Sequence, residues 1–279
     1  MTLPAPRGET GRKNSLLLRT RALSAAVLVP LVALVIWVGD PLLTLSVVAV
    51  GLFAWRELVA MLRLKGYLPF ARLGAVLIVF FVLLPYLLPS ALFRGAFTLI
   101  LMASLIYSLY QEHPAPATDW ALTFGGAAYL GLLLGHFPLL RNLPDGFRWL
   151  AVAILATWIN DTAAYFVGSR WGQHKLFVRI SPKKTWEGFF GGLMVTVLLG
   201  IWPFAIWLNI APGWGALLGI MVAIVATYGD LAESIWKRQA GVKDSGQLIP
   251  GHGGMFDRLD SLLFIIPTIY YFAVWMAKI

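Results

Sequence analysis

Long apolar runs recur along almost the whole chain, and they constrain its fold more than any other feature. A helix needs about 20 mostly apolar residues to cross a hydrocarbon core of roughly 30 Å. The 279 residues are 59% hydrophobic and only 13% charged, a composition that excludes an ordinary soluble domain. The sequence therefore predicts an all-α, polytopic transmembrane bundle with nine spans, at residues 22–38, 41–62, 70–88, 91–111, 119–137, 149–168, 187–208, 214–235 and 259–277.

Basic residues are distributed unevenly between the connections of these spans. The connections on the side of the basic N-terminal segment, residues 1–21, carry Arg63, Lys65, Arg170, Lys175, Arg179, Lys183, Lys184, Lys237, Arg238, Lys243 and Arg258. The other side has only Arg141 and Arg148 in its loops. The positive-inside rule then predicts a cytoplasmic N-terminus, and an odd number of spans puts the two termini on opposite sides. Because topology explains the net charge of +9, we expect no nucleic-acid partner.

Chemistry is expected in one part of the chain. Residues 22–279 are predicted to form a single transmembrane catalytic domain, because no room remains for a separate soluble domain. The run at 22–38 is interpreted as a first span rather than a secretory signal, since no small-residue cleavage site follows it. The two long connections rich in polar residues, 169–186 and 236–258, place the active site in the C-terminal half, residues 149–279.

A polar stripe is predicted where the eighth span ends. Asp230, Glu233, Ser234 and Lys237 stand at positions i, i+3, i+4 and i+7, which share one face of a helix. Snorkelling into the lipid headgroups is an alternative interpretation for Lys237 and Arg238. A carboxylate such as Asp230 beside an apolar run needs a partner that offsets its desolvation, which favours a functional site.

A glycine-rich loop and two further acids follow this stripe. Gly251, Gly253 and Gly254 permit turns whose backbone N–H groups cradle phosphate oxygens. Asp257 and Asp260 are three residues apart at the predicted start of the ninth span, where they would share a helical face and project toward one cation. Carboxylate oxygens suit Mg²⁺, and an N-terminal helix cap is the alternative interpretation for either acid alone.

The sixth span and the segment after it supply more polar groups. Asp161 lies inside the span, and an acid there indicates either a functional site or a structural hydrogen bond between helices. A hydroxyl and ammonium cluster at 181–188 opens the seventh span, a natural place for phosphate, although the positive-inside rule alone would also make this loop basic. Arg56 and Glu57 in the second span are interpreted as structural, either paired or snorkelling.

The motifs in these segments resemble those of a known family. The run S-x-x-K-R-x4-K-D-S-x4-P-G-H-G-G-x-x-D-R-x-D, from Ser234 to Asp260, is similar to the signature of phosphatidate cytidylyltransferases. The S-P-K-K-T-x-E-G run at 181–188 and the Asn160–Asp161 pair also resemble that family. The resemblance extends from about residue 20 to the end, and its specific motifs lie in the C-terminal half.

The resemblance implies a reaction of CTP with phosphatidic acid that yields CDP-diacylglycerol and pyrophosphate for phospholipid biosynthesis. It implies a Mg²⁺ site at Asp230, Asp257 and Asp161, with a second cation left open. The implied catalytic residues are Asp257, Asp260, Lys237, Arg238 and Asp244. The implied substrate-binding residues are Asn160, Lys183, Lys184, Thr185, Glu187, Ser234, Lys243, Gly251, His252, Gly253, Gly254 and Arg258.

The expected setting is a bacterial inner membrane with the active site facing the cytoplasm, and a homodimer is left open. Two other functions also fit the pattern. A CTP-dependent polyprenol kinase would use the same nucleotide in the same setting but would transfer the γ-phosphoryl group. A cation-coupled transporter would also place acids within its spans.

Overall fold

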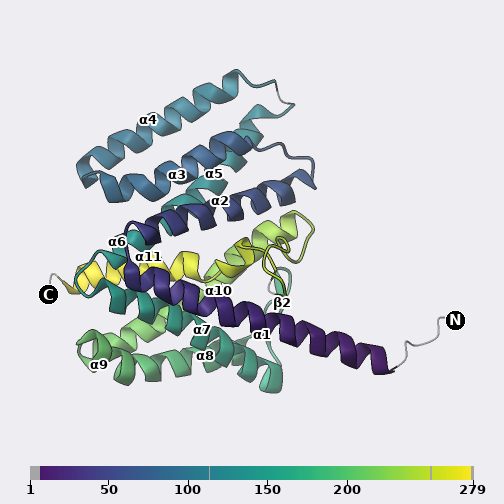
Figure 1. Ribbon diagram of the computed structural model, residues 1–279, viewed down its shortest axis with the longest axis vertical. Helices are drawn as coiled ribbons and strands as arrows, with labels where there is room; N and C mark the ends of the chain where they lie inside the picture. The colour runs from purple at the N-terminus through teal and green to yellow at the C-terminus, as the bar shows by residue number, and fades with distance from the viewer. Residues whose placement is uncertain (1–6, 113, 252, 278–279) are drawn as a thin grey trace.

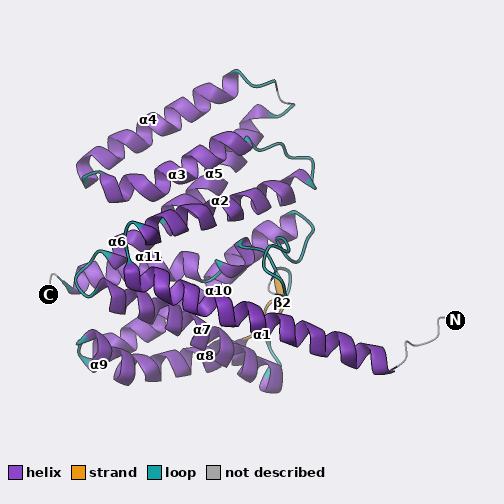
Figure 2. Cartoon of the chain, viewed as in Figure 1, coloured by secondary structure: helices purple, strands orange, loops and turns teal. Residues whose placement is uncertain are grey.

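The computed structural model describes residues 7–112, 114–251 and 253–277, and this part of the chain is almost entirely helical (Figure 2). The N-terminal half consists of α1 (Arg7–Val38), α2 (Leu42–Arg63), α3 (Ala71–Leu87), α4 (Ser90–Leu109), α5 (Pro116–Leu134) and the short α6 (His136–Arg141). The C-terminal half begins with α7 (Gly146–Trp171) and an antiparallel hairpin of β1 (Lys175–Phe177) and β2 (Ser181–Thr185). It continues with α8 (Trp186–Leu199), the π-helical turn η1 (Gly200–Phe204), α9 (Ala205–Leu208), α10 (Pro212–Gln239), the 3-10 turn η2 (Phe256–Arg258) and α11 (Leu262–Met276).

The helices confirm a polytopic membrane fold. Among the described residues, six helical segments are long and apolar enough to cross a bilayer: Leu42–Arg63, Leu92–Leu109, Pro116–Arg141, Gly146–Trp171, Trp186–Leu208 and Pro212–Gln239. Three apolar helices are shorter, at Ala22–Val38, Ala71–Leu87 and Leu262–Met276. All nine predicted spans thus correspond to apolar helical segments, but the number that cross the membrane stays a prediction.

The helices run alternately between two ends of a bundle (Figure 1). One end carries the start of α1, the α2–α3 connection, the β1–β2 hairpin and the long α10–α11 connection. The other end carries α6, α9 and the end of α11. The two polar connections expected to hold the chemistry therefore lie at the same end of the molecule.

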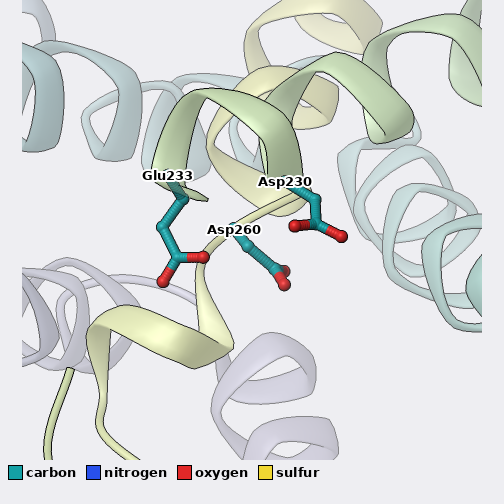
Figure 3. A group of neighbouring side chains, drawn as sticks. All are labelled: Asp230, Glu233 and Asp260. Carbon is teal, nitrogen blue, oxygen red and sulfur yellow. The ribbon is translucent and has the colours of Figure 1, made fainter. Parts of the chain in front are cut away.

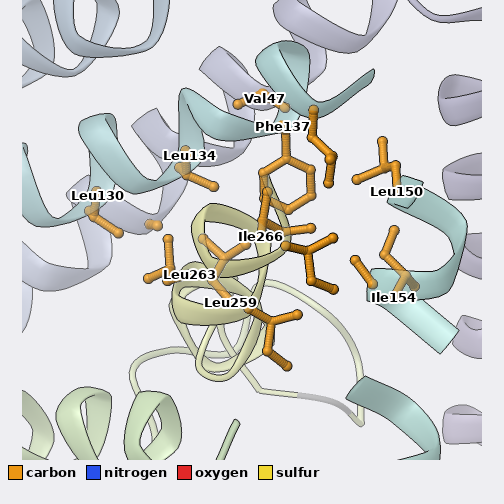
Figure 4. Packing of buried hydrophobic residues seen from close by; sticks show 14 of the residues in the cluster. Val47, Leu130, Leu134, Phe137, Leu150, Ile154, Leu259, Leu263 and Ile266 are labelled. Carbon is orange, nitrogen blue, oxygen red and sulfur yellow. The ribbon is translucent and has the colours of Figure 1, made fainter. Parts of the chain in front are cut away.

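Helix α11 lies at the centre of the core and fixes the position of the acids that precede it. Leu263, Ile265, Ile266 and Ile269 have no exposed surface, because α5, α6, α7 and α10 pack around this helix. Figure 4 shows this packing, with Leu130 and Leu134 of α5 and Leu150 and Ile154 of α7 gathered around Leu259, Leu263 and Ile266. An apolar helix that is enclosed in this way has a fixed position, and it therefore fixes the position of the turn just before it.

The start of this last helix differs from the prediction. Asp257 and Asp260 were expected on one face of a helix beginning near residue 259, but Asp257 lies in η2 and α11 begins only at Leu262. The backbone N–H groups of Ser245 and Gly254 both donate to Asp257 Oδ2, at 2.9 Å each. These bonds hold the segment in a loop, so the two carboxylates do not share a helical face.

Candidate functional site

Three carboxylates meet where α10 ends and the turn before α11 begins. Asp230 and Glu233 lie on α10, and Asp260 reaches them from the turn (Figure 3). One carboxylate oxygen from each lies within 4.8 Å of the others. Gly229 permits this approach, because a Cβ atom there would lie 2.9 Å from the Asp260 carbonyl oxygen. We call Asp230, Glu233 and Asp260 the acidic group.

Two lysines partly neutralise the acidic group. Lys184 of β2 pairs with Asp230 at 2.8 Å and also donates to the Thr227 carbonyl at 3.1 Å. Lys237, one helical turn after Glu233, pairs with it at 2.8 Å and with Asp257 at 2.9 Å. Both lysines were predicted to bind substrate phosphate or to act in catalysis, and in this structure both hold carboxylates in place.

Asp257 is separate from the acidic group and organises the loop. Its Oδ2 accepts hydrogen bonds from Ser245 N–H, Ser245 Oγ and Gly254 N–H, each at 2.9 Å, while Oδ1 accepts from Lys237. Burial alone would raise the pKa of Asp257, but the bonds from Gly254, Lys237 and Ser245 outweigh burial and lower that pKa. Its implied role as a metal ligand stays a prediction, with both oxygens already engaged here.

A cavity of about 1130 Å³ opens beside these groups. Its volume is that of a site for a nucleotide or another large polar ligand. The loop around it turns at Gly251 and Gly253, whose φ angles are +77° and +84°, and Ile249 N–H closes the turn on the Gly253 carbonyl at 2.9 Å. The lining comes from α10 and the α10–α11 connection: Lys237, Lys243, Asp244, Gly246, Gln247, Ile249, Pro250, Gly251, Gly253, Asp257, Arg258 and Asp260.

Six of the residues expected to bind substrate or to act in catalysis have other contacts or lie outside this lining. Ser234 donates to Asp230 at 3.3 Å, and Arg238 Nε donates to the Ile180 carbonyl at 3.0 Å, which ties the hairpin to α10. Thr185 caps α8 by accepting from Gly188 N–H, and Glu187 contacts His174 Nδ1 at 2.6 Å. Asn160 is buried against α8, where a Cβ on Gly192 would lie 2.6 Å from its Oδ1, and Gly254 lies behind the loop against Glu57.

Three further expectations have different outcomes. Asp161 is exposed on α7, outside the acidic group, although it is near enough to Asp260, Lys184 and Asp230 to interact with them electrostatically. Lys183 is exposed on β2. His252 lies outside the described residues. The roles that the resemblance implies for these residues stay predictions.

Comparisons with known proteins identify the family. A profile of the cytidylyltransferase family matches residues 19–276. The chain belongs to the cytidylyltransferase family. Proteins named phosphatidate cytidylyltransferase are similar to it: one from Brucella suis is 37% identical, with 94% of this chain and 95% of the relative covered. A Synechocystis relative is 33% identical, with 93% and 97% covered, and one from Bacillus subtilis is 34% identical, with 84% and 89% covered.

Two acids of this cytidylyltransferase were not predicted to belong to the site. Glu233 was recognised in the polar stripe but was not assigned to the metal, and Glu57 was interpreted as structural. Glu57 in fact contacts the loop that lines the cavity, through Ser245, Met255 and Phe256. The position of Glu57 within a predicted span was a signal of a functional role. No rule of sequence spacing, however, connects Glu57 with loop residues about 190 positions away.

The acidic group fits the divalent cation that this family implies. Three carboxylates offer hard oxygen ligands, which Mg²⁺ prefers. Glu233 has no exposed surface, and neither of its oxygens has a hydrogen-bond partner among the described residues apart from the ion pair with Lys237. The Tyr129 hydroxyl is also buried without such a partner. Carboxylate oxygens left unsatisfied in this way fit a site that a cation completes.

The stability of the metal-free protein is expected to fall as the pH rises from about 4 to about 6. Removal of Asp260 from water and repulsion by Asp230 raise its pKa from 3.8 to about 6. In this window the folded protein still holds a proton that the unfolded chain has released, so deprotonation favours unfolding. Melting temperatures recorded in the presence of a chelator across this pH range test whether stability falls as the pH rises. Asp260→Asn should show a smaller slope, and an unchanged slope would contradict the assignment.

Proposed function

We propose that the cavity beside the acidic group is where the chain transfers the cytidylyl group of CTP to phosphatidate, with CDP-diacylglycerol and pyrophosphate as products. One observation carries this proposal: a single cavity in a membrane-spanning chain is lined by acids, Asp257 and Asp260, and by cations, Lys243 and Arg258. Such a lining suits a reaction between two polyanions. The names of the relatives give the same substrate and the same group transferred.

The main requirement of the reaction is the stabilisation of negative charge on the phosphates, and proton transfer matters less. A phosphate oxygen of the lipid attacks the α-phosphorus of CTP, and the bond from that phosphorus to the bridging oxygen of pyrophosphate breaks. Pyrophosphate leaves with the electron pair. A phosphate monoester has a second pKa of about 6, so the attacking oxygen is already largely ionised near neutral pH and needs little help from a general base.

The basic residues have two different tasks. Lys243 and Arg258 are exposed in the cavity, where they are able to contact the phosphates of CTP. Lys184 and Lys237, of which Lys237 also lines the cavity, pair with the carboxylates and keep them in fixed positions. Fixed charges that need no rearrangement during the reaction are the most effective kind of electrostatic catalyst.

The acidic group would hold Mg²⁺, with Asp230, Glu233 and Asp260 as the residues that offer oxygen ligands. Bound there, Mg²⁺ would neutralise charge on the phosphate oxygens and on the leaving pyrophosphate. Asp161 of α7, which interacts electrostatically with Asp260 and Asp230, is a candidate for a further ligand.

The proposed setting is a bacterial inner membrane with the cavity facing the cytoplasm. The cavity is formed by the α10–α11 connection, at the end of the bundle that also carries the basic hairpin. The positive-inside rule favours the cytoplasm for that end.

The destination of the α-phosphorus of CTP tests the proposed function. Purified protein in detergent is incubated with phosphatidate and CTP labelled at the α-position, in parallel with CTP labelled at the γ-position. The proposal predicts α-label in the lipid and γ-label in pyrophosphate. Label from the γ-position in the lipid would support a lipid kinase instead, and no label in the lipid would contradict both enzymatic functions.

A further inference from the structure

Glu57 of α2 contacts the glycine-rich loop from outside the half of the chain that carries the family motifs. Its Oε1 accepts a hydrogen bond from Met255 N–H at 3.0 Å. Its Oε2 accepts from Phe256 N–H at 2.9 Å and contacts Ser245 Oγ at 2.9 Å. Both oxygens of one carboxylate thus hold the backbone of the loop that lines the cavity.

The same loop segment is bound to a second carboxylate, Asp257. Ser245 Oγ lies 2.9 Å from Glu57 Oε2 and 2.9 Å from Asp257 Oδ2, so its hydroxyl joins the two acids. Asp257 in turn pairs with Lys237, which pairs with Glu233 of the acidic group. A continuous series of polar contacts therefore leads from α2 through the loop to the acidic group.

Two glycines show that the loop is shaped around the Glu57 carboxylate. A Cβ atom on Gly246 would lie 2.8 Å from Glu57 Oε1. A Cβ atom on Gly254 would overlap both Ser245 Oγ and Glu57 Oε2. Only residues without a side chain allow the carboxylate to approach the backbone so closely.

A snorkelling acid or a helix-surface ion pair would not produce these contacts. The partners of Glu57 are loop groups, two of them backbone N–H donors that need acceptors. The neighbouring Arg56 is exposed on the same helix. The Glu57 side chain therefore contacts the loop, whereas the charged side chain of the adjacent Arg56 lies on the protein surface.

We propose that Glu57 is a positioning residue for the nucleotide: it fixes Ser245 and the backbone of residues 253–257 so that the loop keeps the shape that binds CTP and keeps Asp257 against Lys237. We expect the larger effect on CTP, because CTP carries three phosphates and phosphatidate one, and glycine-rich turns such as the one that Glu57 holds cradle phosphate oxygens with their backbone N–H groups. This inference rests on the proposed function, which it deepens by adding a residue from the N-terminal half.

Glu57→Gln tests this inference, with Arg56→Gln as the matched control. Glutamine keeps one acceptor oxygen but turns an NH₂ donor toward an N–H group, so one side of the contact is lost. We expect KM for CTP to rise about tenfold or more, the size of effect typical of residues that orient ligand-binding groups. KM for phosphatidate should stay within about twofold, and Arg56→Gln should match the wild type. Equal losses for both substrates, or no loss, would overturn the proposal.

Amide hydrogen exchange provides a second measurement that does not depend on activity. In Glu57→Gln, a peptide covering residues 253–257 should exchange faster, while peptides from α7 and α11 keep their wild-type protection. Glu57→Asp, whose side chain is one methylene shorter, should give the same local effect if the glutamine variant is not recovered folded. Unchanged exchange in the loop of a folded variant would overturn the proposal. If wild type and Arg56→Gln both fail to transfer the cytidylyl group, the proposed function fails, while the exchange result still decides whether Glu57 holds the loop.

Discussion

Asp260→Asn is expected to lower the rate of cytidylyl transfer by about 10²–10³-fold, the loss typical when one fixed electrostatic contact to the reacting groups is removed. Asp260 both lines the cavity and belongs to the acidic group, so its carboxylate is the contact between the proposed cation and the proposed nucleotide site. Asparagine has nearly the same shape but only one oxygen, and it carries no charge. The rate is measured with α-labelled CTP and saturating phosphatidate in detergent.

The fold of this variant should survive. Asp260 is repelled by Asp230, so removing its charge relieves a like-charge contact, and the melting temperature in chelator near pH 7 should equal or exceed that of the wild type. Asp145→Asn is the matched control. That aspartate is more than half exposed, forms a surface pair with Arg148, and has a φ of +53°, which asparagine tolerates. If Asp260→Asn transfers the cytidylyl group at the wild-type rate, the proposed role of Asp260 in the reaction is wrong.

Lys237→Met is expected to lower the free energy of unfolding by about 3–5 kcal/mol, the usual cost of removing one partner from a buried ion pair. The Lys237 side chain is only 12% exposed and sits between Glu233, which is 0% exposed, and Asp257, which is 7% exposed. Methionine fills similar space but leaves two carboxylates without their cation. Unfolding in mixed micelles measures the loss, and cytidylyl transfer should fall with it.

Two further variants separate charge from packing. Lys65→Met, at an exposed lysine after α2, should unfold like the wild type. Combining Lys237→Met with Glu233→Gln should recover part of the stability, because the second change removes one uncompensated charge. If Lys237→Met unfolds at the same free energy as the wild type, the ion pairs do not hold the site together.

The fold class could be predicted from the sequence because the bilayer imposes a length on every apolar run. The polar stripe on α10 could also be predicted, since positions 230, 233, 234 and 237 share a helical face whatever surrounds the helix. The start of the last helix could not, because the bonds from Ser245 and Gly254 to Asp257 form only after the loop has folded back. The spacing of residues along one helix predicts which side chains share a face of that helix. It does not predict how a later loop folds back against the helix.

The membership of the site was predicted in part. Asp230 and Asp260 were both candidates, and the structure brings them together with Glu233. Motif resemblance also named Asp257 and Asp161, which lie outside the acidic group, and their roles as metal ligands stay predictions. Glu57 could not be assigned from the sequence, since its contacts cross from α2 to residues 245–256. These are tertiary contacts, and no helical or strand period encodes them.

Binding of Mn²⁺, a paramagnetic substitute for Mg²⁺, measures the central claim most directly. Electron paramagnetic resonance of the purified protein in detergent gives the free and bound ion without any need for turnover. The account predicts that the wild type binds Mn²⁺, that Asp260→Asn loses about tenfold or more in affinity, and that Asp145→Asn does not. Equal Mn²⁺ affinity in wild type and Asp260→Asn would contradict the acidic group as the cation site.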